Sequence, residues 1–103
     1  MYIVEKTDEF EKWFIKLKDL RAKAKILFRI QRIEEQGNFG DCESVGNSIR
    51  ELRIHYARGY RVYIRERGNT IVLLLIGGDK STQQKDIERA KQIGENYRHE
   101  DEK

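Results

Sequence analysis

Two short stretches of the chain alternate between apolar residues and residues that bind anions or bases. Arg53 and His55 alternate with apolar neighbours in the first stretch, and Arg61, Tyr63 and Arg65 do so in the second. An arginine fork binds two phosphate oxygens at once, and a tyrosine ring stacks on an unpaired base. On paired strands these side chains share one face, which predicts a surface for an RNA backbone and one or two unstacked bases. The alternative is that the charges only solvate an exposed sheet face.

A second group of charges follows an apolar run, residues 71–76, and two glycines. Asp79 and Lys80 come next, and Ser81 with Gln84 forms the S-x-x-Q pattern that begins a helix. The glycines let the backbone turn tightly and leave room for a ligand. The pattern therefore places both charges at a strand-to-helix corner. An ordinary connection with solvated charges is the alternative.

Cleavage of RNA without a metal ion needs three contributions. The 2′-hydroxyl must lose a proton, the charge on the phosphorane must be stabilised, and the 5′-oxygen must gain a proton. Arg61 and Arg53 carry the charge for the second task, and Lys80 fits a base or a charge clamp if neighbouring arginines lower its pKa. His55 and Tyr63 are the remaining candidates for proton transfer. The products would end in 2′,3′-cyclic phosphates.

The length and charge of the chain limit the alternatives. With 103 residues we expect a single domain covering residues 1–103. Charged residues make up 38% of the chain, above the roughly 25% of typical soluble domains. The net charge is +3, but residues 49–80 hold seven basic residues and three acids, a local charge of +4, so the rest sums to −1. This excess on predicted strands favours a phosphate-bearing partner.

Cysteine content and hydropathy indicate in which part of the cell the protein is expected to function. Cys42 is the single cysteine, so an intramolecular disulfide is impossible and a reducing cytoplasm fits the chain. No run of 18 apolar residues and no charged-then-apolar leader occurs, so we expect neither a membrane span nor a signal peptide. We expect no metal ion and no cofactor.

Periodicity predicts the elements of the first half. Residues 2–6 fit a short strand, and an apolar stripe at helical spacing predicts a helix capped by Thr7. A longer helix is expected from about 20 to 36, where Gly37 stops it. The glycine, asparagine and serine content of residues 37–47 is typical of a loop.

From Ile49 the period changes to two. A three-residue hairpin loop, 57–59, pairs Tyr56 with Tyr60 and places Arg53 opposite Tyr63. The next strand is apolar throughout and therefore central, with Arg61 beside its residue Ile76.

A last helix is expected from Thr82 to about Tyr97, followed by a frayed tail at about residues 99–103. The order is β-α-α-β-β-β-α. This predicts an α+β fold: a small, mostly antiparallel sheet with helices packed on one face and a concave basic surface on the other.

The ordered motifs resemble a known family. They are S-I-R-E-L-R-I at 48–54, G-Y-R-V-Y at 59–63, N-T-I-V-L-L-L at 69–75, G-G-D-K at 77–80, then Gln83, Asp86-Ile87 and Ala90-Lys91. This set is similar to the addiction module killer proteins, a HigB-like branch of the RelE/ParE superfamily of bacterial toxins. The resemblance covers nearly the whole chain and is strongest from residue 48 to residue 91.

The resemblance implies the same small α+β fold and transfers a few site residues. HigB- and RelE-like mRNA interferases place an essential arginine on the third strand, matched by Arg61, and catalytic residues after the last strand, matched by Asp79, Lys80 and Ser81. Some relatives carry Tyr or His directly after the acid, where this chain has Lys80 and Ser81, so the resemblance does not identify its general acid. The candidate catalytic residues are Arg61, Lys80, Arg53, His55 and Asp79, and the candidate RNA-binding residues are Arg50, Tyr63, Arg65, Arg67 and Lys80.

The resemblance implies the toxin of a type II toxin–antitoxin module, acting as a metal-independent, ribosome-associated mRNA endoribonuclease that arrests translation. The implied partners are mRNA on the ribosome and a cognate antitoxin, a small helix-turn-helix protein. Two alternatives remain: a ParE-like toxin that binds and poisons DNA gyrase, and a nucleic-acid-binding module without catalysis. The expected closeness of Arg61 to Lys80 favours RNA cleavage over gyrase binding.

Overall fold

The computed structural model describes residues 1–101, with side chains as far as Tyr97. One five-stranded sheet has the order β1-β5-β4-β3-β2, in which β1 runs parallel to β5 and the other pairs are antiparallel. The strands are β1 (Ile3–Lys6), β2 (Cys42–Gly46), β3 (Ile49–Ile54), β4 (Tyr60–Arg67) and β5 (Ile71–Gly78). The helices are α1 (Asp8–Lys16), α2 (Leu20–Gln36), the single 3₁₀ turn η1 (Lys80–Thr82) and α3 (Gln83–Asp101). The α+β class and the predicted order of elements are confirmed, with β2 as an addition inside the expected loop.

Side-chain caps fix the ends of the first two helices. Thr7 Oγ1 accepts from the Phe10 amide at 3.0 Å and donates to the Leu75 carbonyl at 2.6 Å, so the cap also ties α1 to β5. Asp19 begins α2 by accepting from the Ala22 amide at 3.1 Å. Gly37 ends α2 in the left-handed conformation, with φ of 65°.

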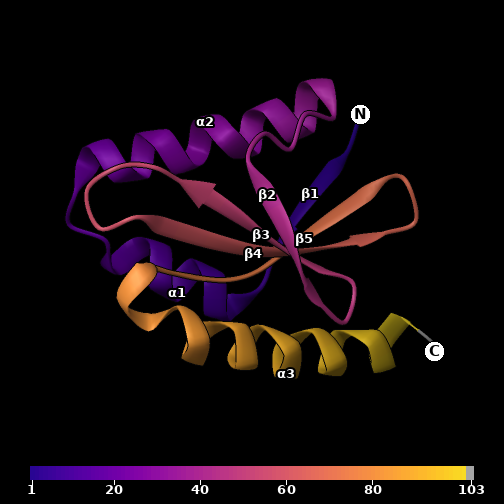
Figure 1. Cartoon of the computed structure of the whole chain (residues 1–103). Helices are drawn as coiled ribbons and strands as arrows, with labels where there is room; N and C mark the ends of the chain where they lie inside the picture. The colour runs from indigo at the N-terminus through magenta and orange to yellow at the C-terminus, as the bar shows by residue number, and fades with distance from the viewer. Residues whose placement is uncertain (102–103) are drawn as a thin grey trace.

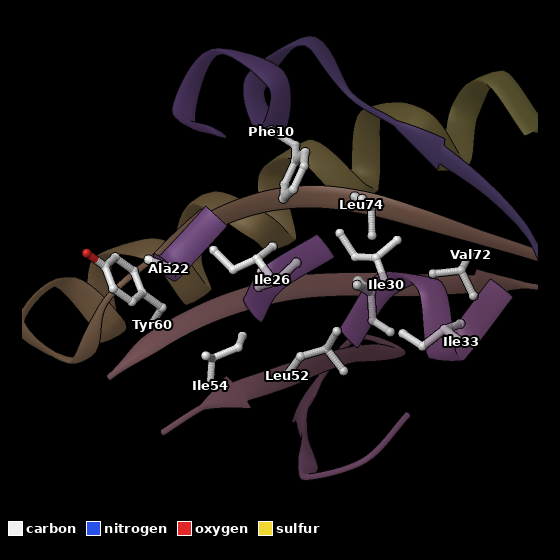
Figure 2. Close-up of a cluster of buried hydrophobic side chains, with 12 residues drawn as sticks. Phe10, Ala22, Ile26, Ile30, Ile33, Leu52, Ile54, Tyr60, Val72 and Leu74 are labelled. Carbon is white, nitrogen blue, oxygen red and sulfur yellow. The ribbon is translucent and has the colours of Figure 1, made fainter. Parts of the chain in front are cut away.

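The larger core lies between α1, α2 and one face of the sheet (Figure 1). Figure 2 shows Ile26 and Ile30 of α2 over the strand residues Leu52 and Leu74, with Phe10 of α1 completing the cluster. These side chains are at most 6% exposed. Their burial orients the sheet, and therefore decides which side chains of β3 and β4 point to the opposite face.

Helix α3 covers that opposite face, on the other side of the sheet from α2 (Figure 1). Ala90 and Ile93 of α3 pack there against Tyr63, Leu73 and Leu75 in a second core. The predicted packing of helices on one face therefore holds for α1 and α2 only, and the expected concave basic surface is wrong. The central strand is apolar on both sides, so each face needs its own helical cover.

The hairpin register differs from the predicted one by two residues. Arg53 lies opposite Arg61, because the β3–β4 loop takes five residues, 55–59, instead of three. A shift of two leaves every side chain on its expected face. The β4–β5 register is shifted by one residue from the expected one, since Arg65 pairs with Leu73. A bulge in β5 next to Tyr63 adds a second residue, so Arg61 lies opposite Gly78 and not Ile76.

The last helix is longer than expected from the sequence. Helix α3 continues to Asp101, and residues 102–103 of the expected frayed tail lie outside the described residues. Fraying of that tail therefore stays a prediction. No helix within the described residues combines the length and the apolar composition needed to cross a bilayer.

Candidate functional site

Three of the candidate residues, Arg61, Asp79 and Lys80, gather at one end of the sheet, where the β3–β4 loop meets the corner between β5 and η1. Arg61 pairs in the sheet with Gly78, so its side chain starts next to Asp79 and Lys80. A Cβ atom built on Gly59 would lie 3.4 Å from Lys80 Cβ and 3.6 Å from Arg61 Nη1. Arg61 and Lys80 thus approach the same point beside Gly59, as the sequence predicted. The Lys80 amide also donates to the Arg58 carbonyl at 3.3 Å, which ties the corner to the loop.

A buried carboxylate organises this end of the sheet. Glu51 of β3 is fully buried, and its Oε2 accepts from Tyr63 Oη at 2.9 Å and from Gln83 Nε2 at 2.8 Å. Its Oε1 accepts from Arg53 Nε at 3.1 Å and lies 3.8 Å from Arg61 Nε. Burial alone would raise the pKa of Glu51, but the hydrogen bonds from Gln83, Tyr63 and Arg53 and the charge of Arg61 lower it below the usual value. A charged Glu51 therefore holds two arginines side by side.

Arg61 is the more enclosed of these two arginines. The residue is 7% exposed, and its Nη1 donates to the Gly59 carbonyl at 3.3 Å. Its Nε is buried without a hydrogen-bond partner, because 3.8 Å to Glu51 is an ion-pair distance and too long for a hydrogen bond. The guanidinium is therefore fixed in place, with its Nη1 beside Gly59.

The side chains of Tyr63 and Arg65 are buried in contacts within the fold. Tyr63 is fully buried beneath α3, so its ring offers no face to a base. Burial and the hydrogen bond to Glu51 raise the pKa of Tyr63 far above its usual range, which keeps the phenol protonated. Arg65 is 8% exposed and donates to the Gly94 carbonyl of α3 at 2.7 Å. Tyr63 therefore cannot stack on a base, and Arg65 is held against α3.

His55 lies outside β3, in the loop, and its side chain is largely exposed. It pairs with Asp41, and this hydrogen bond is the main reason that the pKa of Asp41 falls below its usual value. His55 and Arg53 line one groove between β3 and α2. Arg53 also pairs with the exposed Glu43. His55 is thus a neighbour of Arg53, although it does not share the face of the strand.

Asp79 shapes the corner. Its Oδ1 accepts from the Ser81 amide at 2.8 Å and from Ser81 Oγ at 2.5 Å, so Asp79 caps η1 and fixes the backbone that carries Lys80. The expected capping role of Ser81 is wrong, because the capping box is formed by Asp79 and Thr82 and α3 starts at Gln83. A cavity of about 440 Å³ opens beside this corner. Its cationic lining residues include Lys16, Lys18 and Arg58.

The remaining RNA-binding candidates lie elsewhere. Arg50 forms an ion pair with Glu66 at 3.0 Å and places its guanidinium 4.6 Å from the centre of the Phe39 ring. Arg67 pairs with Glu5 at 3.3 Å. The structure does not bring either residue to the corner. Among the described residues, no group of histidine, cysteine, aspartate and glutamate side chains could hold a metal ion.

Three contributors to the site, Glu51, Gln83 and Arg58, were not predicted from the sequence. Glu51 was counted only as an opposing charge, and Gln83 only as part of a motif, although both hold the arginines in place. Arg58 Nη1 lies 4.0 Å from Asp79 Oδ2, and Arg58 lines the cavity beside the corner. An acid flanked by arginines on an apolar strand was an available signal for Glu51, since buried carboxylates need such partners.

Comparisons with known proteins agree with this fold. The crystal structure of the intact E. coli RelBE toxin–antitoxin complex contains a chain similar to this one, with a TM-score of 0.65 and 14% identity. The match covers 77% of this chain and 96% of that one, which shows a shared fold. An uncharacterized protein of Haemophilus influenzae is 52% identical over 92 residues, covering 89% of this chain and 92% of that protein. The family model described as phage derived protein Gp49-like (DUF891) matches residues 12–97, so the chain belongs to the Gp49-like family.

Proposed function

We propose that this chain is the toxin of a type II toxin–antitoxin module and cleaves mRNA on the ribosome in the cytoplasm. Membership of the Gp49-like family and the fold shared with a chain of the RelBE complex support a toxin. The approach of Arg61 and Lys80 to one point beside Gly59 is the observation that favours cleavage. The assignment to the HigB-like branch is part of the same proposal and rests on the sequence motifs.

In the proposed reaction the ribose 2′-oxygen attacks the adjacent phosphorus, and the bond to the 5′-oxygen breaks. Arg61 and Arg53, held by Glu51, stabilise the negative charge that builds on the phosphoryl oxygens. Lys80 and His55 are the exposed titratable candidates, and we assign the two proton transfers to them. The products are a 2′,3′-cyclic phosphate and a 5′-hydroxyl, and no metal or cofactor takes part.

The proposal is tested by inducing the protein alone and mapping mRNA ends on ribosomes in a translating extract. We expect growth arrest together with new 5′-hydroxyl ends on ribosome-bound mRNA. Growth arrest with DNA damage and intact mRNA would support gyrase poisoning instead. Binding of RNA without cleavage would leave a nucleic-acid-binding module. Normal growth at good expression of folded protein would contradict the toxin assignment.

A further inference from the structure

The largest charge excess of the chain lies on the helices, away from the sheet. Residues 12–32, which cover most of α1 and α2, contain eight lysines and arginines and one acid, a net charge of +7. The whole chain has a net charge of +3, so all other residues sum to −4. The sequence analysis overlooked this concentration. A field of this strength on one helical hairpin favours a strongly acidic partner.

The outer side of α2 also exposes apolar side chains. Leu20 is 77% exposed, Leu27 47% and Phe28 57%, whereas Ile26 and Ile30 of the same helix are in the core. The Arg32 guanidinium lies 5.7 Å from the centre of the Phe28 ring. Large exposed apolar side chains among cations are typical of surfaces that bind protein, since an RNA backbone gains little from leucine.

One groove combines both features with the candidate site. It has a volume of about 430 Å³ and lies between α2 and the end of β3. Its lining includes Ala24, Lys25 and Phe28 of α2 together with Arg53, Ile54 and His55. Arg29 fixes the groove, because its guanidinium donates to the carbonyls of Phe39 at 2.7 Å and Asp41 at 2.9 Å and also to that of Arg53.

We propose that this groove binds an acidic amphipathic helix of a protein partner. An apolar side chain of that helix packs on Phe28, and its acids pair with Lys25. The identity of the partner as the antitoxin rests on the proposed function.

The test uses the products of the two reading frames that flank the gene, each co-expressed with the full chain. Affinity is measured for each product that binds, and hydrogen exchange maps the protected amides. We expect protection of residues 20–32 and 53–55. Phe28→Ala should weaken binding about 30-fold and Lys25→Glu at least about tenfold. The matched controls are Ile3→Ala, an exposed apolar residue on β1, and Lys85→Glu, an exposed lysine on α3 outside residues 12–32, and both should change affinity less than about twofold.

The outcomes separate this proposal from the proposed function. In one outcome a flanking product binds and relieves growth arrest, but the amides protected from exchange lie outside the groove. That result would overturn the proposed docking site and leave the toxin assignment intact. Failure of both flanking products to bind would overturn the groove proposal, whereas the growth and mRNA tests described above decide the toxin assignment separately. A third outcome is unchanged partner affinity in Phe28→Ala together with reduced ribosome association in Lys25→Glu. That result would identify the groove as an RNA surface and overturn the proposal.

Discussion

The hydroxyl of Tyr63 and the carboxylate of Glu51 meet beneath α3, with Tyr63 Oη donating to Glu51 Oε2 at 2.9 Å. Both side chains are fully buried. Because the phenol stays protonated, it acts as a permanent donor that helps to keep Glu51 charged. The charged carboxylate in turn faces Arg53 and Arg61, so the second core and the candidate site share one network.

Replacing this carboxylate should be costly. In Glu51→Gln the enclosed Arg61 loses its charge partner and the half-buried Arg53 loses one of two. We expect the free energy of unfolding to fall by about 3–5 kcal/mol. Urea denaturation measures the change. Glu43→Gln is the matched control, since Glu43 pairs with the same Arg53 but its side chain is 58% exposed. That control should change the free energy by at most about 1 kcal/mol. Equal effects in both variants would contradict a special role for Glu51.

The same carboxylate should make stability depend on pH. The pKa of Glu51 is lowered in the folded protein, whereas a glutamate in the unfolded chain titrates near ~4.3. Between these two values the unfolded state binds more protons, so the stabilisation is complete above pH of about 4.3 and is lost as pH falls through the folded pKa. We expect the stability gap between the wild type and Glu51→Gln to stay constant from neutral pH to about pH 4.3 and to narrow at lower pH. A constant gap would show that Glu51 does not titrate as described.

Local sequence patterns predicted correctly that Arg61 and Lys80 lie close together at the corner between β5 and η1. Alternation placed Arg53 and Arg61 on one face, and the two glycines that end β5 placed Lys80 beside that face. A register error of two residues did not disturb these assignments, because the period of a strand is two. Such predictions depend only on the geometry of neighbouring residues.

Contacts between elements that are distant in sequence could not be predicted from local patterns. The apolar stripe of α3 was expected, but nothing local indicated that it would bury Tyr63 and Arg65. Strand β2 was also missed, since its residues resemble a loop and become a strand by pairing with β3, as Cys42 does with Leu52. Burial and edge pairing are decided by elements distant in sequence.

Close packing of α1 on β5 gives a prediction about the first core. A Cβ atom on Gly77 would lie 2.2 Å from Trp13 Cζ3, so Gly77→Ala should reduce the free energy of unfolding by about 1–3 kcal/mol. Trp13→Leu removes the ring, and the double variant should then be less destabilised than the sum of the single changes. Gly94→Ala is the control, because its Cβ would meet Ile49 Cδ1 at an ordinary 3.6 Å. Additive effects at Gly77 and Trp13 would contradict this contact.

Replacing Lys80 should affect mRNA cleavage without affecting the stability of the fold. Arg61 is enclosed with Glu51, so its replacement would disturb the fold as well as the site, whereas Lys80 is exposed on η1. We expect Lys80→Ala to keep the unfolding midpoint and antitoxin binding while cleavage of ribosome-bound mRNA falls about 10²–10³-fold. Growth arrest should be lost accordingly. Lys85→Ala, an exposed lysine on the first turn of α3, should behave like the wild type. Full toxicity and unchanged mRNA cleavage in Lys80→Ala would show that the corner beside Gly59 is not where the reaction takes place.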